Sequence, residues 1–287
     1  MKNAIDYVAD KKHHPVDSVP CKPTPEMETF MTMFKRLQEM TEHHLQRSLN
    51  SSGISVPNFF NHRHKVLAIE AAECTGFRVV LPEWWLDNSA ATAGIAATGI
   101  GMCEHYRSMA RYVSERGVMS PENVLVVDYS QAALGAALVK VRHGTYERNP
   151  SYFTDVDMGA VSPWRSDQGE AAYWNQIKAR LQDLPKRAKI MPTRLIFMGD
   201  SVSDKTFLNV LRDALMELSG QSFEDQIAPI DFNQAVVDWL VQMETADPLF
   251  RAAIGAAELA KRSMESPGGC MESTSCYEEK GEKKDTS

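Results

Sequence analysis

The chain has 287 residues, of which 43% are apolar and 24% charged, a composition typical of a globular protein with a sizeable core. A net charge of -7, with lysines and arginines scattered along the chain, argues against nucleic acid as the main partner. Residues 1–14 lack the apolar region of a signal peptide, and no apolar stretch is long enough to span a membrane. We therefore expect a cytoplasmic protein.

The cysteines support the same expectation. There are five of them, an odd number, and no two form a C-x-x-C pair: Cys21, Cys74, Cys103, Cys270 and Cys276. This spacing fits neither a disulfide framework nor a zinc ribbon. It indicates a reducing compartment.

The two ends of the chain differ from the middle. Residues 1–23 are polar, and residues 265–287 are rich in Ser, Gly, Glu and Lys, so we expect both segments to be disordered or irregular. Between them, patterns typical of helices and of strands alternate, which predicts an α/β protein.

The first predicted elements are a long helix, a strand, a second helix and a second strand. The first helix begins after Thr24, its cap, and carries an apolar stripe at helical spacing: Phe30, Met33, Phe34, Leu37 and Met40. Residues 54–56 read as a strand, and Asn61 as the cap of the second helix. The buried stripe predicted for that helix is Val66, Leu67, Ile69 and Cys74. Gly76 ends it, and residues 77–81 form the next strand.

The second half of the chain continues the alternation. Small residues dominate 89–101, which predicts a helix packed closely against a sheet. Residues 124–127 and 136–141 are apolar runs that predict a hairpin, with Asp128 at the end of its first strand. The pattern then predicts a helix, a strand and three more helices: 170–184, 195–198, 207–218, 236–243 and 250–260.

Five short motifs carry a family resemblance through their order and spacing. They are VPNFFN at 56–61, DNSAATA at 87–93, DYSQAA at 128–133, GDS at 199–201 and AIGAA at 253–257. In this order the chain resembles the nucleotide-binding domain of the heat-shock protein 70 (DnaK-type) family, within the actin-like ATPase superfamily. It is also similar to eroded heat-shock-like proteins of filamentous fungi.

The resemblance implies an α/β, two-lobed actin-like ATPase (ribonuclease H-like) fold. Residues 24–118 would be the remnant of the N-terminal lobe, and residues 119–264 the C-terminal lobe. The implied cofactor is ATP or ADP with Mg²⁺. Asp128, with Mg²⁺ bound through water, and Asp87 are the catalytic candidates. The cofactor contacts implied by the motifs are Asp128, Ser130, Gly199, Ser201 and Gly255.

The same motifs have lost residues on which phosphate binding depends. The first phosphate hairpin of the family is missing, because residues 1–23 are too few to hold it. In the second hairpin Ser130, Gln131 and Ala132 replace three glycines, and their side chains narrow the phosphate cradle. We therefore expect a binding, scaffold or regulatory module with weak or no ATP binding, and a slow Mg²⁺-dependent ATPase as the alternative. The missing hairpin exposes apolar surface, which predicts a protein partner or self-association.

Other interpretations of these residues stay open. Asp128 could cap the turn after its strand, and 199–201 could be a tight strand-to-helix turn. Residues 197–204 also resemble the GDS block of SGNH-type esterases, in which Ser201 would be the nucleophile. Such a serine needs a histidine base downstream, whereas the last histidine of this chain is His143, so this activity is disfavoured.

Overall fold

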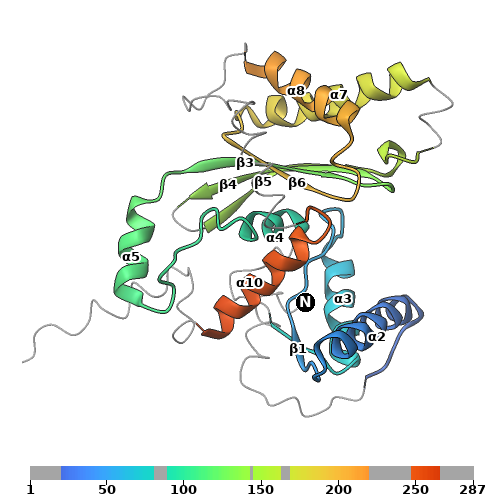
Figure 1. The fold of residues 1–287 in the computed structure, drawn as a ribbon, viewed down its shortest axis with the longest axis vertical. Helices are drawn as coiled ribbons and strands as arrows, with labels where there is room; N and C mark the ends of the chain where they lie inside the picture. The colour runs from blue at the N-terminus through green and yellow to red at the C-terminus, as the bar shows by residue number, and fades with distance from the viewer. Residues whose placement is uncertain (1–20, 81–88, 143–144, 163–168, 220–246, 266–287) are drawn as a thin grey trace, which may run out of the picture.

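A mixed sheet forms the centre of the structure and carries helices on both faces (Figure 1). The structure, a computed structural model, describes residues 21–80, 89–142, 145–162, 169–219 and 247–265. Helices α7 (Glu170–Ala188) and α8 (Lys205–Ser219) cover one face, and α4 (Ala90–Ala96) covers the other. Helix α10 (Arg251–Glu265) packs on α4. The chain is therefore an α/β protein, as its sequence predicts.

The sheet has the strand order β5-β4-β3-β6. Its strands are β3 (Glu122–Tyr129), β4 (Leu134–Arg142), β5 (Thr145–Asp155) and β6 (Arg194–Met198). Strands β3, β4 and β5 pair antiparallel, and β6 joins β3 in parallel after the crossover through α7. The predicted hairpin is confirmed as β3 and β4, and the strand predicted at 195–198 is confirmed as β6.

Residues 124–127 of β3 form a continuous apolar run because both faces of the strand are buried there. Leu125 and Val127 belong to the cluster beneath α7 and α8, whereas Val124 and Val126 pack towards α4. A strand covered on both sides has no polar face, so its sequence shows a continuous apolar run. The predicted helices at 170–184 and 207–218 are confirmed as α7 and α8, which supply the cover on one side.

Two helices, α2 (Pro25–Leu45) and α3 (His62–Cys74), begin at the predicted caps. The side chain of Thr24 accepts a hydrogen bond from the N–H of Met27, and that of Asn61 accepts one from the N–H of His64. The predicted stripe of α3 is wrong, since its buried residues are Lys65, Ala68, Ala71 and Ala72. Alanines let α3 approach its neighbours closely. The close packing gained in this way is more favourable than burying the larger side chains on the adjacent part of the helix surface.

The strand predicted at 54–56 is also wrong. Strand β1 is Ser51–Ser52, which pairs in parallel with β2 (Arg78–Val79), and Val56 forms one isolated bridge with Ser89. The second predicted strand, 77–81, contains β2, and residue 81 lies outside the described residues. Together β1 and β2 form a separate two-stranded sheet beside α3.

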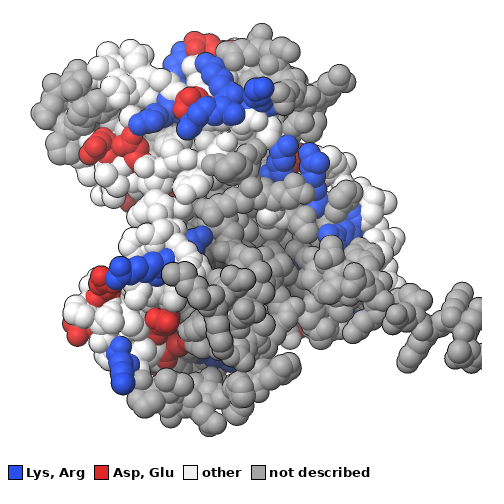
Figure 2. Space-filling view, turned by 180° about the vertical axis from the view of Figure 1, so that it is seen from behind, with Lys and Arg blue, Asp and Glu red and all other residues white. Residues whose placement is uncertain are grey.

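Helices α5 (Met109–Val118) and η1 (Val156–Met158) complete the described elements. The helix predicted at 236–243 lies outside the described residues, as do nearly all of the predicted irregular ends. The contact of α10 with α4 joins a helix of the predicted C-terminal lobe to one of the predicted N-terminal remnant. On the face drawn in Figure 2, basic and acidic side chains are interspersed. In the part of the chain that the structure describes, no helix has the length and apolarity of a membrane span.

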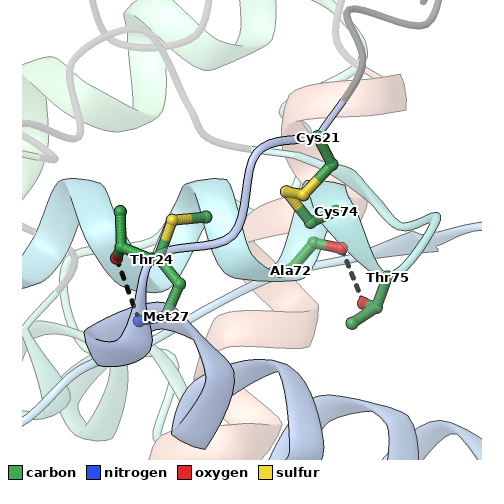
Figure 3. The surroundings of a disulfide bond; sticks show 6 residues. All are labelled: Cys21, Thr24, Met27, Ala72, Cys74 and Thr75. Carbon is green, nitrogen blue, oxygen red and sulfur yellow. Dashed lines mark hydrogen bonds between the residues drawn. A yellow bond between two sulfur atoms is a disulfide. The ribbon is translucent and has the colours of Figure 1, made fainter.

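Cys21 and Cys74 form a disulfide, with their Cα atoms 5.5 Å apart (Figure 3). The expectation of a chain without disulfides is therefore wrong for this pair. The two cysteines lie 53 residues apart, and only the packing of α2 on α3 brings them together. With a disulfide present, the cysteines no longer argue for a reducing compartment. Cys103 is buried as a free thiol.

Candidate functional site

The turns that follow β3 and β6 lie side by side at the carboxyl ends of these two strands. The two strands are parallel neighbours, and Asp128 at the end of β3 pairs in register with Met198 at the end of β6. The N–H of Ser201 donates to the carbonyl oxygen of Tyr129 at 3.1 Å. The structure thus brings together the DYSQAA and GDS motifs.

The turn between β3 and β4 is closed by its own hydrogen bonds. The N–H of Ser130 donates to the carbonyl oxygen of Ala133 at 3.0 Å, and the N–H of Ala133 donates to the Ser130 hydroxyl at 3.2 Å. The carbonyl oxygen of Ser130 accepts the N–H of Ala160. The side chain of Ser130 therefore stabilises the turn from within.

Asp200 connects this turn to the one after β6. One oxygen of its carboxylate, Oδ1, accepts the N–H of Gln131 and the hydroxyl of Ser201, each at 2.9 Å. The GDS motif by itself predicts no contact for Asp200. Its partner Gln131 lies 69 positions away, and nothing in the local sequence pattern signals that contact.

Gly199 is required by the close approach of the two turns. Its φ of +96° is disfavoured for residues with a side chain. A Cβ at this position would overlap the carbonyl oxygen of Tyr129 and would lie 2.8 Å from Oδ1 of Asp128. The N–H of Gly199 donates to the carbonyl oxygen of Pro248 at 3.3 Å, which ties the turn to the start of α10.

Asp128 is partly buried, and no described residue donates a hydrogen bond to its carboxylate. Burial raises the pKa of this carboxyl group to about 6, and the nearby charge of Asp200 contributes to the rise. At pH 7 the group is therefore mostly ionised. The alternative in which Asp128 caps the turn lacks its expected contact, since no described backbone N–H reaches the carboxylate.

Asp128 has an acidic neighbour at the strand ends, Asp200, whose charge acts on it. Across the described ranges, no group of three or more His, Cys, Asp or Glu side chains is arranged to hold a metal ion. Asp87, the second catalytic candidate, lies outside the described residues.

The remaining candidates have contacts of other kinds. The hydroxyl of Ser201 donates to Asp200, its N–H donates to Tyr129, and its carbonyl oxygen accepts the N–H of Asp204, so the described contacts include no histidine base. Gly255 lies in α10, where a Cβ would overlap the carbonyl oxygen of Ala93 in α4. The glycine at 255 thus permits close packing of two helices.

Several backbone N–H groups of the two turns already have acceptors within the protein. Phosphate binding needs backbone N–H groups that point outward and are free to donate. The N–H groups of Ser130, Gln131, Ala133 and Ser201 all donate within the protein. The acceptor for Gln131 is itself a carboxylate, which would repel a phosphate.

No protein-family model matches the chain, and no curated protein gives a significant match. The family resemblance consequently rests on the order of the motifs.

Proposed function

We propose that the chain is a binding, scaffold or regulatory module built on a heat-shock-protein-70-type nucleotide-binding scaffold, with weak or no ATP binding. The observation that carries this proposal is the hydrogen bond from the N–H of Gln131 to Asp200. Through this bond, the carboxylate of Asp200 accepts the backbone N–H that a phosphate-binding turn would offer to a nucleotide. The turn therefore already has a negatively charged partner within the protein.

Electrostatics at the turns support the proposal. Asp128 and Asp200 are close enough for the charge of one to raise the pKa of the other. A triphosphate bound beside these strand ends would add further negative charge within a Debye length of both carboxylates, so salt would screen the repulsion only in part. Binding would require either Mg²⁺ to neutralise the carboxylates or a rearrangement of the turns.

The arrangement of the sheet also supports an actin-like scaffold. Three antiparallel strands are followed by a helical crossover to β6, which lies parallel to β3, and helices cover both faces. This order places the two eroded motifs at neighbouring strand ends, as the resemblance requires. A ligand site at the carboxyl ends of such strands is common in open α/β sheets.

An apolar stripe on α2 supports a protein partner or self-association. Met33, Leu37 and Met40 follow helical spacing and are 47%, 53% and 58% exposed. They stand on one face of the helix, because residues three and four apart lie above one another. The buried side of the helix is instead formed around Met27, Phe30 and Phe34.

The alternative is a slow Mg²⁺-dependent ATPase, favoured by the two carboxylates at adjacent strand ends. Asp128 would be the residue that holds Mg²⁺, through water. Carboxylates are the ligands Mg²⁺ prefers, although it usually keeps several waters and needs few protein ligands.

Calorimetry with Mg-ATP and Mg-ADP, followed by phosphate-release assays, separates the two functions. We expect a dissociation constant above about 1 mM for either nucleotide. Phosphate release should be the same for wild type, Asp128→Ala and the control Asp213→Ala, which removes an exposed carboxylate from α8. Turnover that is abolished by Asp128→Ala and retained by Asp213→Ala would establish the ATPase instead.

A further inference from the structure

Apolar side chains from the first turns of α2 pack the helix against α3 and its neighbours. Met27 is buried, and Phe30 and Phe34 are half-buried against an apolar cluster that we call the α3 cluster: Ile54, Val56, Ala68, Ala72 and Phe77. An ion pair of 2.6 Å joins Glu26 to Arg63, but both side chains are exposed and such pairs contribute little. In the part of the chain that the structure describes, the docking of α2 therefore involves these three apolar side chains and one exposed ion pair.

The disulfide adds a covalent link at the start of this helix. Cys21 lies just before Thr24, the N-cap of α2, and Cys74 is the last residue of α3 (Figure 3). Without the bond, α2 would be connected to α3 only through the chain that follows its C-terminal end. With the bond, both ends of α2 are tethered, so the effective concentration of the helix at its docking face is higher.

The bond is also accessible to a reducing agent, because Cys21 is exposed and Cys74 is only half-buried. A thiolate of a dithiol reductant attacks the sulfur of Cys21, and Cys74 leaves as a thiolate that takes up a proton. The second thiol of the reductant then displaces Cys21 and forms a cyclic disulfide. Two electrons and two protons pass from the dithiol to the protein, which gains two thiols.

We propose that the Cys21–Cys74 disulfide is a redox-controlled staple. A dithiol reductant opens it and releases α2 from α3, and exchange with a disulfide oxidant, which is itself reduced to two thiols, re-forms the bond and restores the docked helix. Release uncovers the α3 cluster, in which Ala68 and Ala72 are buried. The central sheet stays folded, because its own cores lie beneath α7, α8 and α4 and include neither α2 nor α3. This inference rests on the Cys21–Cys74 bond and the packing of α2, and it is independent of nucleotide binding.

Hydrogen exchange of the full chain, followed by mass spectrometry with and without dithiothreitol, tests the staple. We expect exchange in peptides of α2 to rise about tenfold or more on reduction, while peptides of β3 and β6 keep their rates. The double variant Cys21→Ser/Cys74→Ser should show fast α2 exchange under both conditions. Cys103→Ala is the matched control, since it removes a thiol outside the pair and should respond to dithiothreitol as wild type does.

Three results would overturn the proposal. The first is a hydrogen-exchange rate in α2 peptides that stays unchanged when the disulfide is fully reduced. The second is an equal rise in α2, β3 and β6, since the disulfide would then stabilise the whole fold. The third is peptide mapping of the oxidised protein that finds no link between Cys21 and Cys74.

Discussion

The carboxylate of Asp200 accepts the backbone N–H of Gln131 at 2.9 Å and thereby joins two turns that are 69 residues apart in sequence. The same oxygen accepts the hydroxyl of Ser201. Hydrogen bonds to a charged acceptor are stronger than neutral ones, so this contact both fixes the turn and occupies its donor. The weak phosphate binding that we propose therefore has two causes: the glycines of the turn are replaced, and the carboxylate of Asp200 accepts one of the backbone N–H groups that remain.

Replacing Asp200 should expose this donor. In Asp200→Ala the N–H of Gln131 loses its acceptor and a negative charge leaves the turns, so we expect Mg-ADP to bind about tenfold more tightly than to wild type. The lost hydrogen bond should lower the free energy of unfolding by about 1–2 kcal/mol. Calorimetry measures the affinity, with Asp213→Ala as the control for a lost surface charge. Equal affinities in all three proteins would show that Asp200 does not block the site.

The raised pKa of Asp128 predicts a dependence of stability on pH. The pKa is about 6 in the folded protein against 3.8 for an ordinary aspartate, so the folded state binds the proton more tightly than the unfolded state. This group therefore stabilises the fold at low pH, and its contribution falls as the pH rises from about 4 to about 6. Asp128→Asn should remove this loss of stability between pH 4 and pH 6, and it should raise the free energy of unfolding at pH 7 by up to about 3 kcal/mol.

Urea unfolding at several pH values measures this effect, and carbon NMR of the Asp128 carboxyl group measures its pKa directly. Asp200→Asn should lower that pKa, since it removes the charge that contributes to the rise while leaving the burial of Asp128 in place. A pKa near 4 in the wild-type protein would contradict the prediction.

The sequence predicts those parts of the fold that depend on local pattern. Thr24 and Asn61 are recognisable caps, because their side chains act on N–H groups only three positions away. The apolar runs of β3 and β4 are recognisable because both strands are almost wholly buried. In each case the signal and its cause lie within a few residues of each other.

The sequence does not predict features that depend on distant neighbours. The alanine face of α3 is chosen by what packs against it, and hydrophobicity alone favours the larger side chains beside it. The contact of Asp200 with Gln131 and the pairing of Cys21 with Cys74 both need the folded chain. For the candidate site, the sequence predicts a turn at the end of each strand, whereas the carboxylate that connects the two turns is seen only in the folded chain.

Gly255 offers a test of helix packing against cofactor binding. Gly255→Ala places a Cβ onto the carbonyl oxygen of Ala93, so α10 must move away from α4, and we expect a loss of about 1–3 kcal/mol in the free energy of unfolding. The matched control is Gly117→Ala in α5, where nothing lies within 4 Å of the added Cβ. That substitution should stabilise the protein by about 0.5–1 kcal/mol.

Chemical denaturation without nucleotide measures both variants. A packing role requires the loss at Gly255 to appear in the absence of any ligand. If Gly255→Ala were as stable as wild type and changed only the affinity for Mg-ADP, the cofactor contact implied by the family resemblance would be the better account.

The apolar stripe of α2 predicts self-association or binding to a partner. In the triple variant Met33→Gln/Leu37→Gln/Met40→Gln, half-exposed apolar side chains become polar ones that also favour helices, so the fold and its melting temperature should change little. Sedimentation velocity should show that wild type associates as its concentration rises and that the variant does so less. Val118→Gln removes an even more exposed apolar side chain from α5 and should behave as wild type. A wild-type protein that remains a compact monomer at every concentration and binds no partner would contradict this prediction, because the stripe would then be stable in water on its own.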